Sequence, residues 1–217
     1  MKKVLLFILL NTVLAFSQQV YKIPFASKDN SIELSVVNKS TEEVKNIQVN
    51  AIDLPNWIKL DPANGTGETN KIIPSIKPEE EVPVLFTFSI EKEAMVNKET
   101  TLNFNVTSKS GEVWKKEITI SVLPPAKFEL YQNYPNPFNP STTISFVIPN
   151  SSFVILKVFD VLGREVATLI NEEKEPGYHS ILWNGSDNSS GMYIYQVNAK
   201  SIDGNETISR KKMLMIK

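Results

Sequence analysis

The stretch Val82-Pro83-Val84-Leu85-Phe86-Thr87-Phe88-Ser89-Ile90 decides the fold class. Its apolar residues Val84, Phe86, Phe88 and Ile90 recur at every second position. Side chains of an extended chain point to alternate faces, so these four residues share one face. The pattern predicts a β-strand that buries this face in a hydrophobic core.

The same alternation recurs on both sides of this stretch. The predicted strands cover residues 31–36, 47–51, 102–106 and 118–122. Three clusters of turn-forming residues separate the strands, namely Asn38-Lys39-Ser40, Asp61-Pro62-Ala63-Asn64-Gly65 and Ser108-Lys109-Ser110-Gly111. No long segment between them has the 3.6-residue period of a helix. Short strands at this spacing predict an antiparallel β-sandwich.

The dipeptide Pro124-Pro125 ends this first series, because neither residue has the backbone N–H that a sheet ladder requires. A second series of strands follows, over residues 144–148, 153–159, 166–170, 181–183, 193–197 and from 208 onward. Within this series, Asp203-Gly204 predicts a type I′ hairpin turn. The sequence therefore predicts an all-β fold with two immunoglobulin-like antiparallel β-sandwich domains in tandem, residues 18–123 and 128–217, joined by a proline linker, residues 124–127.

The three tryptophans are candidates for the two cores. We expect Trp57 and Trp183 to be core residues. Trp114 has charged neighbours on both sides and is the candidate for a ligand-facing aromatic side chain, as in a carbohydrate-binding module.

The amino-terminal residues have the features of a secretory signal peptide. Met1-Lys2-Lys3 is basic, the run from Val4 to Phe16 is mostly apolar, and small residues precede the predicted cleavage between Ser17 and Gln18. The apolar run is shorter than the roughly 20 residues that a membrane-spanning helix needs. We therefore expect residues 1–17 to be cleaved off during export.

Composition excludes several classes of function. The 217 residues include no cysteine and one histidine, so a disulfide scaffold, a Cys-ligated metal site, a thiol nucleophile and a multi-His metal site within one chain are excluded. Without residues 1–17, the chain has 21 basic and 24 acidic residues, which gives no reason to expect a nucleic-acid partner. No catalytic constellation or phosphate-binding loop is present, and we expect neither enzymatic activity nor a cofactor.

Charge is unevenly distributed in the second half. Residues 210–217 contain four basic residues and no acid, whereas residues 126–209 contain five basic and nine acidic residues. Two interpretations fit this pattern. Basic residues on an edge strand discourage unwanted pairing, or Lys211, Lys212 and the last strand form a surface that is presented to an export machine.

One segment resembles a known family. The run Phe128-Glu129-Leu130-Tyr131-Gln132-Asn133-Tyr134-Pro135-Asn136-Pro137-Phe138-Asn139-Pro140-Ser141-Thr142-Thr143-Ile144 resembles the start of the type A C-terminal sorting domain of type IX secretion substrates. Further motifs follow in order at residues 158–166, 177–183, 190–193 and 210–217. The residues that carry the resemblance are Tyr134, Pro135, Asn136, Pro137, Phe138, Asn139, Pro140, Gly163, Arg164, Gly191, Tyr193, Lys211 and Lys212.

The resemblance implies a route and partners. The signal peptide would deliver the chain to the periplasm, and the sorting domain would direct it through the outer membrane by the type IX secretion machinery. A surface peptidase would then remove the sorting domain, and the product would be released or attached to a surface polysaccharide. Residues 54–60 and 76–81 resemble bacterial immunoglobulin-like accessory domains. The expected function is that of a secreted or cell-surface, non-catalytic immunoglobulin-like protein. The alternatives are a carbohydrate-binding or adhesion module and a protein similar to flagellar hook-capping proteins.

Overall fold

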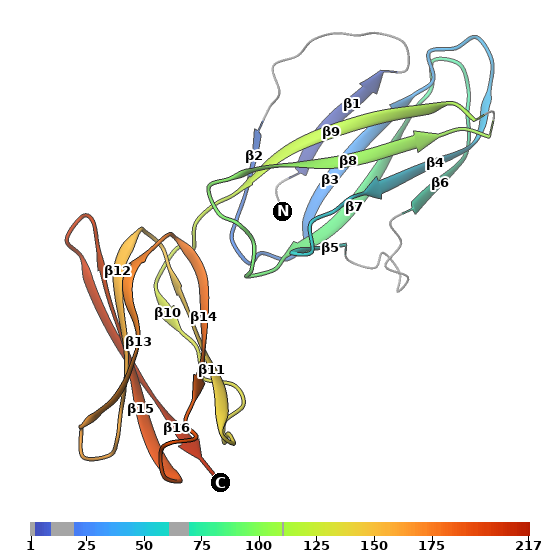
Figure 1. Ribbon diagram of the computed structural model, residues 1–217. Coiled ribbons are helices and arrows are strands. Elements are labelled where there is room, and N and C mark those ends of the chain that lie inside the picture. The colour runs from blue at the N-terminus through green and yellow to red at the C-terminus, as the bar shows by residue number, and fades with distance from the viewer. Residues whose placement is uncertain (1–2, 10–19, 61–69, 110) are drawn as a thin grey trace. The chain divides into compact units, whose positions relative to one another are not determined.

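The computed structural model describes residues 3–9, 20–60, 70–109 and 111–217 (Figure 1). These residues form strands and connecting loops, and among them no helix could cross a membrane. The chain divides into two compact units, Met1–Leu123 (unit 1) and Pro124–Lys217 (unit 2). The boundary lies at the proline pair.

Unit 1 contains a four-stranded sheet in the order β1-β3-β7-β5 and a five-stranded sheet in the order β2-β9-β8-β4-β6. Its strands are β1 (Lys3–Leu9), β2 (Val20–Ile23), β3 (Asn30–Val37), β4 (Val44–Ile52), β5 (Ile58–Leu60), β6 (Asn70–Ile76), β7 (Glu81–Ile90), β8 (Glu99–Thr107) and β9 (Val113–Val122). Neighbouring strands are antiparallel, except for the parallel pairs β1–β3 and β2–β9.

The core of unit 1 lies between its two sheets. The alternating residues of β7, Val84, Phe86, Phe88 and Ile90, are all buried there, as the opening stretch predicts. Across the core, Phe86 contacts Phe104 of β8 with ring centroids 5.2 Å apart. The hydrophobic burial of both sheet faces holds the sandwich together, since the chain has no cysteine.

The strand β1 is the main difference from the sequence-based expectation for this half. Residues 1–17 are expected to be a signal peptide outside the fold, whereas Lys3–Leu9 pairs with β3 over its whole length. The predicted cleavage residues Ser17 and Gln18 lie outside the described residues, as does the turn cluster at residues 61–65. Cleavage therefore stays a prediction.

Unit 2 contains a three-stranded sheet in the order β10-β11-β14 and a four-stranded sheet in the order β13-β12-β15-β16. Its strands are β10 (Glu129–Leu130), β11 (Ser141–Ile148), β12 (Ser152–Phe159), β13 (Glu165–Lys174), β14 (Gly177–Asn184), β15 (Gly191–Ser201) and β16 (Glu206–Met215). All pairs in both sheets are antiparallel. Buried residues from both sheets, including Phe146, Leu156, Trp183 and Tyr195, form one core.

The hairpin between β15 and β16 differs from the predicted type I′ turn. A type I′ turn needs positive φ at both central residues, but here Gly204 has φ +87° and Asp203 does not have positive φ. The loop instead spans three residues. Ser201 N donates to Asn205 O at 2.9 Å, and Gly204 N donates to Ser201 O at 2.9 Å. The extra residue before Asp203 explains the difference, because a three-residue loop needs only one left-handed position.

Candidate functional site: a proline-rich segment that holds strand β16

The proline-rich segment, residues 132–140, lies between β10 and β11 and folds back on itself. The peptide bonds Tyr134–Pro135 and Asn136–Pro137 are cis. The buried side chain of Asn133 donates to Pro135 O at 3.0 Å and to Thr142 Oγ1 at 2.9 Å. Thr142 Oγ1 in turn donates to Pro135 O at 2.7 Å. These bonds fix the first turn of the segment against the start of β11.

Tyr195 connects this segment to the centre of the other sheet. Its hydroxyl donates to Tyr131 O at 2.8 Å and accepts from Asn133 N at 2.9 Å. The side chain is fully buried on β15, and burial raises the pKa of Tyr195 to about 12. A buried hydroxyl that satisfies two backbone groups stays neutral and specifies one position for the chain.

The segment binds the backbone of β16 on the side opposite to β15. Phe138 N donates to Leu214 O at 3.0 Å, and Ile216 N donates to Phe138 O at 3.0 Å. Two side chains add to this contact: Asn136 Oδ1 accepts from Leu214 N at 2.9 Å, and Gln132 Nε2 donates to Lys212 O at 2.8 Å. The backbone from Lys212 to Ile216 is therefore hydrogen-bonded on this edge, while β15 pairs with the other edge of β16.

Aromatic and methionine side chains anchor the same region from inside the core. The buried ring of Phe138 lies 5.5 Å from that of Trp183, which lies 5.3 Å from that of Tyr193. Met213 and Met215 point into this core and are 1 % exposed. Close packing extends to Gly185, where an added Cβ would lie 2.8 Å from Met215 Sδ. Tyr193 also donates through its hydroxyl to Ser189 O at 2.6 Å.

The two lysines expected to form one surface lie on opposite faces of β16. Lys211 pairs with Tyr195, which is buried, so Lys211 is on the inner face and is half-buried. Lys212 pairs with Ile194 and is exposed on the outer face. Strand period two causes this separation. The outer face of β16 presents Arg210, Lys212 and Leu214 instead.

The remaining sorting-motif residues are mostly exposed. Tyr134 is 82 % exposed and pairs across a bridge with Thr143, whose other neighbour Leu182 is 64 % exposed. Of residues 134–140, only Phe138 is buried, and Pro140 is half-buried; Tyr134, Pro135, Asn136, Pro137 and Asn139 are exposed. Pro140 O accepts from Gly185 N at 2.9 Å.

Gly163 and Arg164 belong to the β12–β13 hairpin turn, which closes around a carboxylate that the sequence reasoning did not select. Asp160 Oδ1 accepts from Leu162 N at 2.9 Å and Arg164 N at 3.0 Å, and Asp160 Oδ2 accepts from Arg164 Nε at 2.7 Å. Hydrogen bonds from Arg164 lower the pKa of Asp160. Gly163 has φ +79°, as expected for a turn glycine, and Gly191 begins β15 with φ +154°. The spacing of Asp160 before Gly163 is the signal that could have identified this turn.

The other candidates lie in the sandwiches themselves. Trp57 and Trp183 are buried core residues, as predicted. Trp114 pairs with the fully buried Val106 and packs, half-buried, against the core of unit 1. His179, the one histidine of the chain, pairs with buried Phe146 and faces inward, with the two rings 5.4 Å apart. Its Nε2 lies 2.8 Å from Glu175 O, and burial lowers the pKa of His179.

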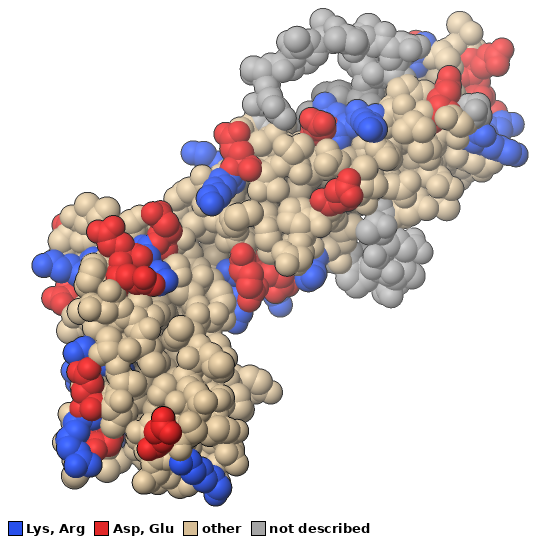
Figure 2. Space-filling view, viewed as in Figure 1, with Lys and Arg blue, Asp and Glu red and all other residues tan. Residues whose placement is uncertain are grey.

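Charged side chains of both signs are interspersed on the face of the protein shown in Figure 2. Among the described residues there is no group of three or more His, Asp and Glu side chains that could hold a metal ion. Arg210, Lys211 and Lys212 form no ion pair with any described carboxylate, although Arg210 Nε donates to Gln196 Oε1.

Comparisons with solved structures show low-level likenesses over most of the chain. Among solved structures, the chain is similar to dimeric latent PorU from Porphyromonas gingivalis (TM-score 0.35, 14 % identity, 93 % of this chain and 19 % of that chain). It is also similar to the E. coli chaperone DraB (TM-score 0.31, 14 % identity, 91 % and 93 %) and to the CupB2 chaperone of Pseudomonas aeruginosa (TM-score 0.27, 11 % identity, 88 % and 96 %). These likenesses are too low to support a statement about function.

A search of curated proteins gave no match. Residues 132–214 match a family model that is described as the secretion system C-terminal sorting domain. The matched residues run from the start of the proline-rich segment to Leu214 of β16. They thus contain the proline-rich segment and β16 as far as Leu214, whereas Ile216, which also bonds to Phe138, lies beyond the match. This part of the chain is therefore similar to secretion system C-terminal sorting domains.

Proposed function

We propose that this protein is a substrate of a type IX secretion system and is exported through its sorting domain. The observation that carries the proposal is the family match over residues 132–214. The hydrogen bonds between the proline-rich segment and β16 support the proposal. A recognition strand that is hydrogen-bonded on both edges already has a defined position before it binds a partner.

The secretion machinery would contact the outer face of β16. Arg210 and Lys212 are exposed there beside Leu214, and residues 210–217 contain no acid. Cationic side chains without carboxylate partners remain available for an acidic surface on another protein. The inner-face Lys211 is half-buried in the same strand and provides an internal comparison.

Processing would follow export. Ala126 and Lys127 are exposed and lie outside the strands, near the start of unit 2 and before β10. Exposed chain outside regular secondary structure, close to the boundary between two compact units, is the kind of segment that peptidases cut. We propose that a surface peptidase cuts here, and that residues 18 to about 126 remain as a non-catalytic immunoglobulin-like protein at the cell surface or in the medium. Attachment to a surface polysaccharide would retain this product at the cell surface.

The experiment expresses the full chain in a bacterium with a type IX system and measures its amount in the medium and on the cell surface. The double variant Arg210→Gln, Lys212→Gln should accumulate in the periplasm, whereas the matched variant Lys211→Gln should be exported like the unaltered chain. Thermal unfolding of the purified variants checks that each one is folded.

Three results would contradict parts of the proposal. Normal export of a chain that lacks residues 128–217 would exclude the sorting function. Normal export of the Arg210, Lys212 double variant would exclude the outer face of β16 as the recognition surface. An exported product whose intact mass still includes unit 2 would exclude the processing step.

A further inference from the structure

The edge of β3 is the feature that the export function leaves unexplained. On one side β3 pairs with β7, and on the other it pairs with β1 in a register that runs from Lys3 opposite Ser31 to Leu9 opposite Val37. The whole of β1 belongs to residues 1–17, whose removal is part of the proposed export route. The remaining sheet would be β3-β7-β5, with β3 as an outer strand.

The other outer strands of unit 1 are poor templates for further pairing. β5 has three residues, β2 has four, and β6 contains Pro74 and Lys71. Short strands, proline and lysine are the features that natural sheets use to protect their edges. β3 has none of these features: its eight residues Asn30–Val37 include no proline and a single charged residue, Glu33.

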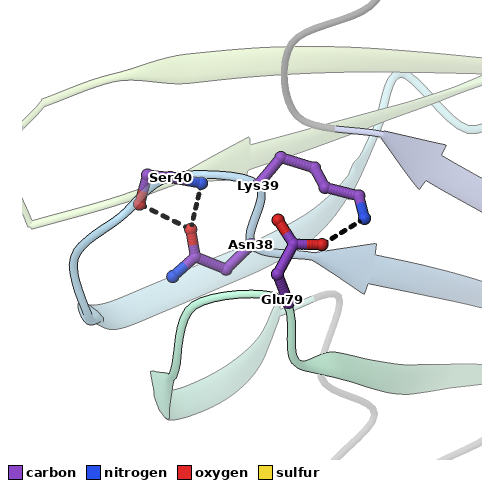
Figure 3. Close-up of polar contacts among 4 residues, drawn as sticks. All are labelled: Asn38, Lys39, Ser40 and Glu79. Carbon is purple, nitrogen blue, oxygen red and sulfur yellow. Dashed lines mark hydrogen bonds and ion pairs between the residues drawn. The ribbon is translucent and has the colours of Figure 1, made fainter.

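Both ends of β3 are fixed by hydrogen bonds, as Figure 3 shows for the end that leads into the Asn38 turn. The buried side chain of Asn38 accepts from Ser40 N at 3.0 Å and donates to Ile76 O at 2.9 Å. At the other end, Asn30 Nδ2 donates to Phe88 O at 3.2 Å. An edge that is already extended and fixed loses little conformational entropy when a further strand pairs with it.

Ser31 indicates that β1 is an imperfect occupant of this edge. Its Oγ atom is buried and has no hydrogen-bond partner. Leaving a buried hydroxyl unpaired costs about 1–3 kcal/mol. Ser31 lies opposite Lys3 of β1, so removal of β1 leaves the edge of β3 beside Ser31 without a paired strand.

We propose that, after removal of residues 1–17, two copies of the chain pair antiparallel through β3 and form a twofold dimer. The proposal rests on that removal, which the export route includes. A register with Leu34 opposite Leu34 of the second copy makes β3 self-complementary. Ile32 then lies opposite Val36, which continues the apolar inner face, and Glu33 lies opposite Ser35, so no like charges meet.

The test is analytical ultracentrifugation of a purified chain that begins at Gln18 and ends at Lys217. It should sediment as a dimer. The double variant Ser31→Lys, Val37→Lys should sediment as a monomer. In the proposed register, position 31 of one copy lies opposite position 37 of the other, so two like charges would meet at each end of the paired strands. The matched control is Ile72→Lys on the outer strand β6, which should remain dimeric. Thermal unfolding verifies that all three proteins are folded.

Cysteine cross-linking tests the register, since the chain has no cysteine of its own. A mixture of Glu33→Cys and Ser35→Cys copies should form a disulfide-linked dimer under mild oxidation far faster than either variant alone. Equal cross-linking in all three samples would overturn the register.

The dimer proposal fails if the unaltered chain sediments as a monomer, if the double-lysine variant remains a dimer, or if the exported protein retains residues 1–17. The sedimentation measurement needs no export, so its failure is distinct from that of the export proposal. If the chain is exported normally but is a monomer, only the dimer proposal is contradicted and the export proposal stands.

Discussion

Phe138 is the residue on which the contact between the proline-rich segment and β16 most depends. Its backbone N–H and C=O both bind β16, while its ring packs on Trp183 in the core. The backbone of Tyr134, in the same segment, bonds instead to Thr143 of β11, and its side chain is 82 % exposed. Two aromatic residues of one motif therefore have different roles, one in holding the fold and one at the surface.

Replacing Phe138 with alanine should lower the free energy of unfolding of unit 2 by about 3–5 kcal/mol, the usual loss for a buried phenylalanine. Urea unfolding of the purified chain, monitored by near-UV circular dichroism, measures this change. The control Tyr134→Ala should change stability by less than about 0.5 kcal/mol, as exposed positions generally do. Similar losses for the two variants would show that the ring of Phe138 is not a core residue.

The single histidine should make unit 2 less stable in mild acid. Burial lowers the pKa of His179 below its usual 6.5 in the folded state. The unfolded chain therefore binds a proton first, and stability falls as the pH decreases through about 6.5. Urea unfolding at about pH 7 and pH 5 should show this loss, and the variant His179→Gln should reduce it. An unchanged pH dependence in the variant would exclude His179 as its source.

Local patterns along the chain were predicted better than the face of the sheet on which a given residue lies. The alternation in β7 and the proline-rich segment could be identified directly, because local pattern determines them. The inward position of His179 and the separation of Lys211 from Lys212 depend on register, which fixes the face on which each residue lies. The inner or outer face of β16 follows only once Met213 and Met215 are known to be buried.

At the scale of elements, long alternating strands were predicted and short ones were missed. β2, β5 and β10 have only two to four residues, too few to show a period. β6 has seven residues, but Pro74 argues against a strand in sequence, and its position at the edge of the sheet removes that objection. Whether such segments form strands depends on their position in the tertiary structure.

The β12–β13 turn permits a prediction about one glycine. Gly163 has φ +79°, and a Cβ added there would meet no atom within 4 Å. The substitution Gly163→Ala therefore acts through backbone strain alone and should reduce stability by about 1–2 kcal/mol. Chemical denaturation measures the difference in the free energy of unfolding. The control is Leu162→Ala, a substitution of the exposed neighbouring residue. A neutral Gly163→Ala variant would mean that the turn adopts another conformation.

At the scale of the whole molecule, the two units have separate cores, and the exposed residues Ala126 and Lys127 lie just after the boundary between them. Limited digestion with trypsin should cut after Lys127 and release a fragment that begins at Phe128 and remains folded. Mass spectrometry identifies the fragment, and circular dichroism tests its fold. The variant Lys127→Gln should not yield it. Immediate degradation of residues 128–217 would show that unit 2 depends on unit 1.

The burial of Met213 and Met215 has a consequence for redox chemistry. Oxidation to the sulfoxide converts an apolar side chain into a polar one, and a buried sulfur is protected while the surrounding structure is closed. Met95 and Met192 are about half exposed and should oxidise first in dilute peroxide. Whenever β16 leaves its place, the sulfurs of Met213 and Met215 become accessible. Oxidation of these two methionines would then hinder the return of β16 to the sheet. Sulfoxide at Met213 and Met215 would therefore indicate that β16 has been displaced.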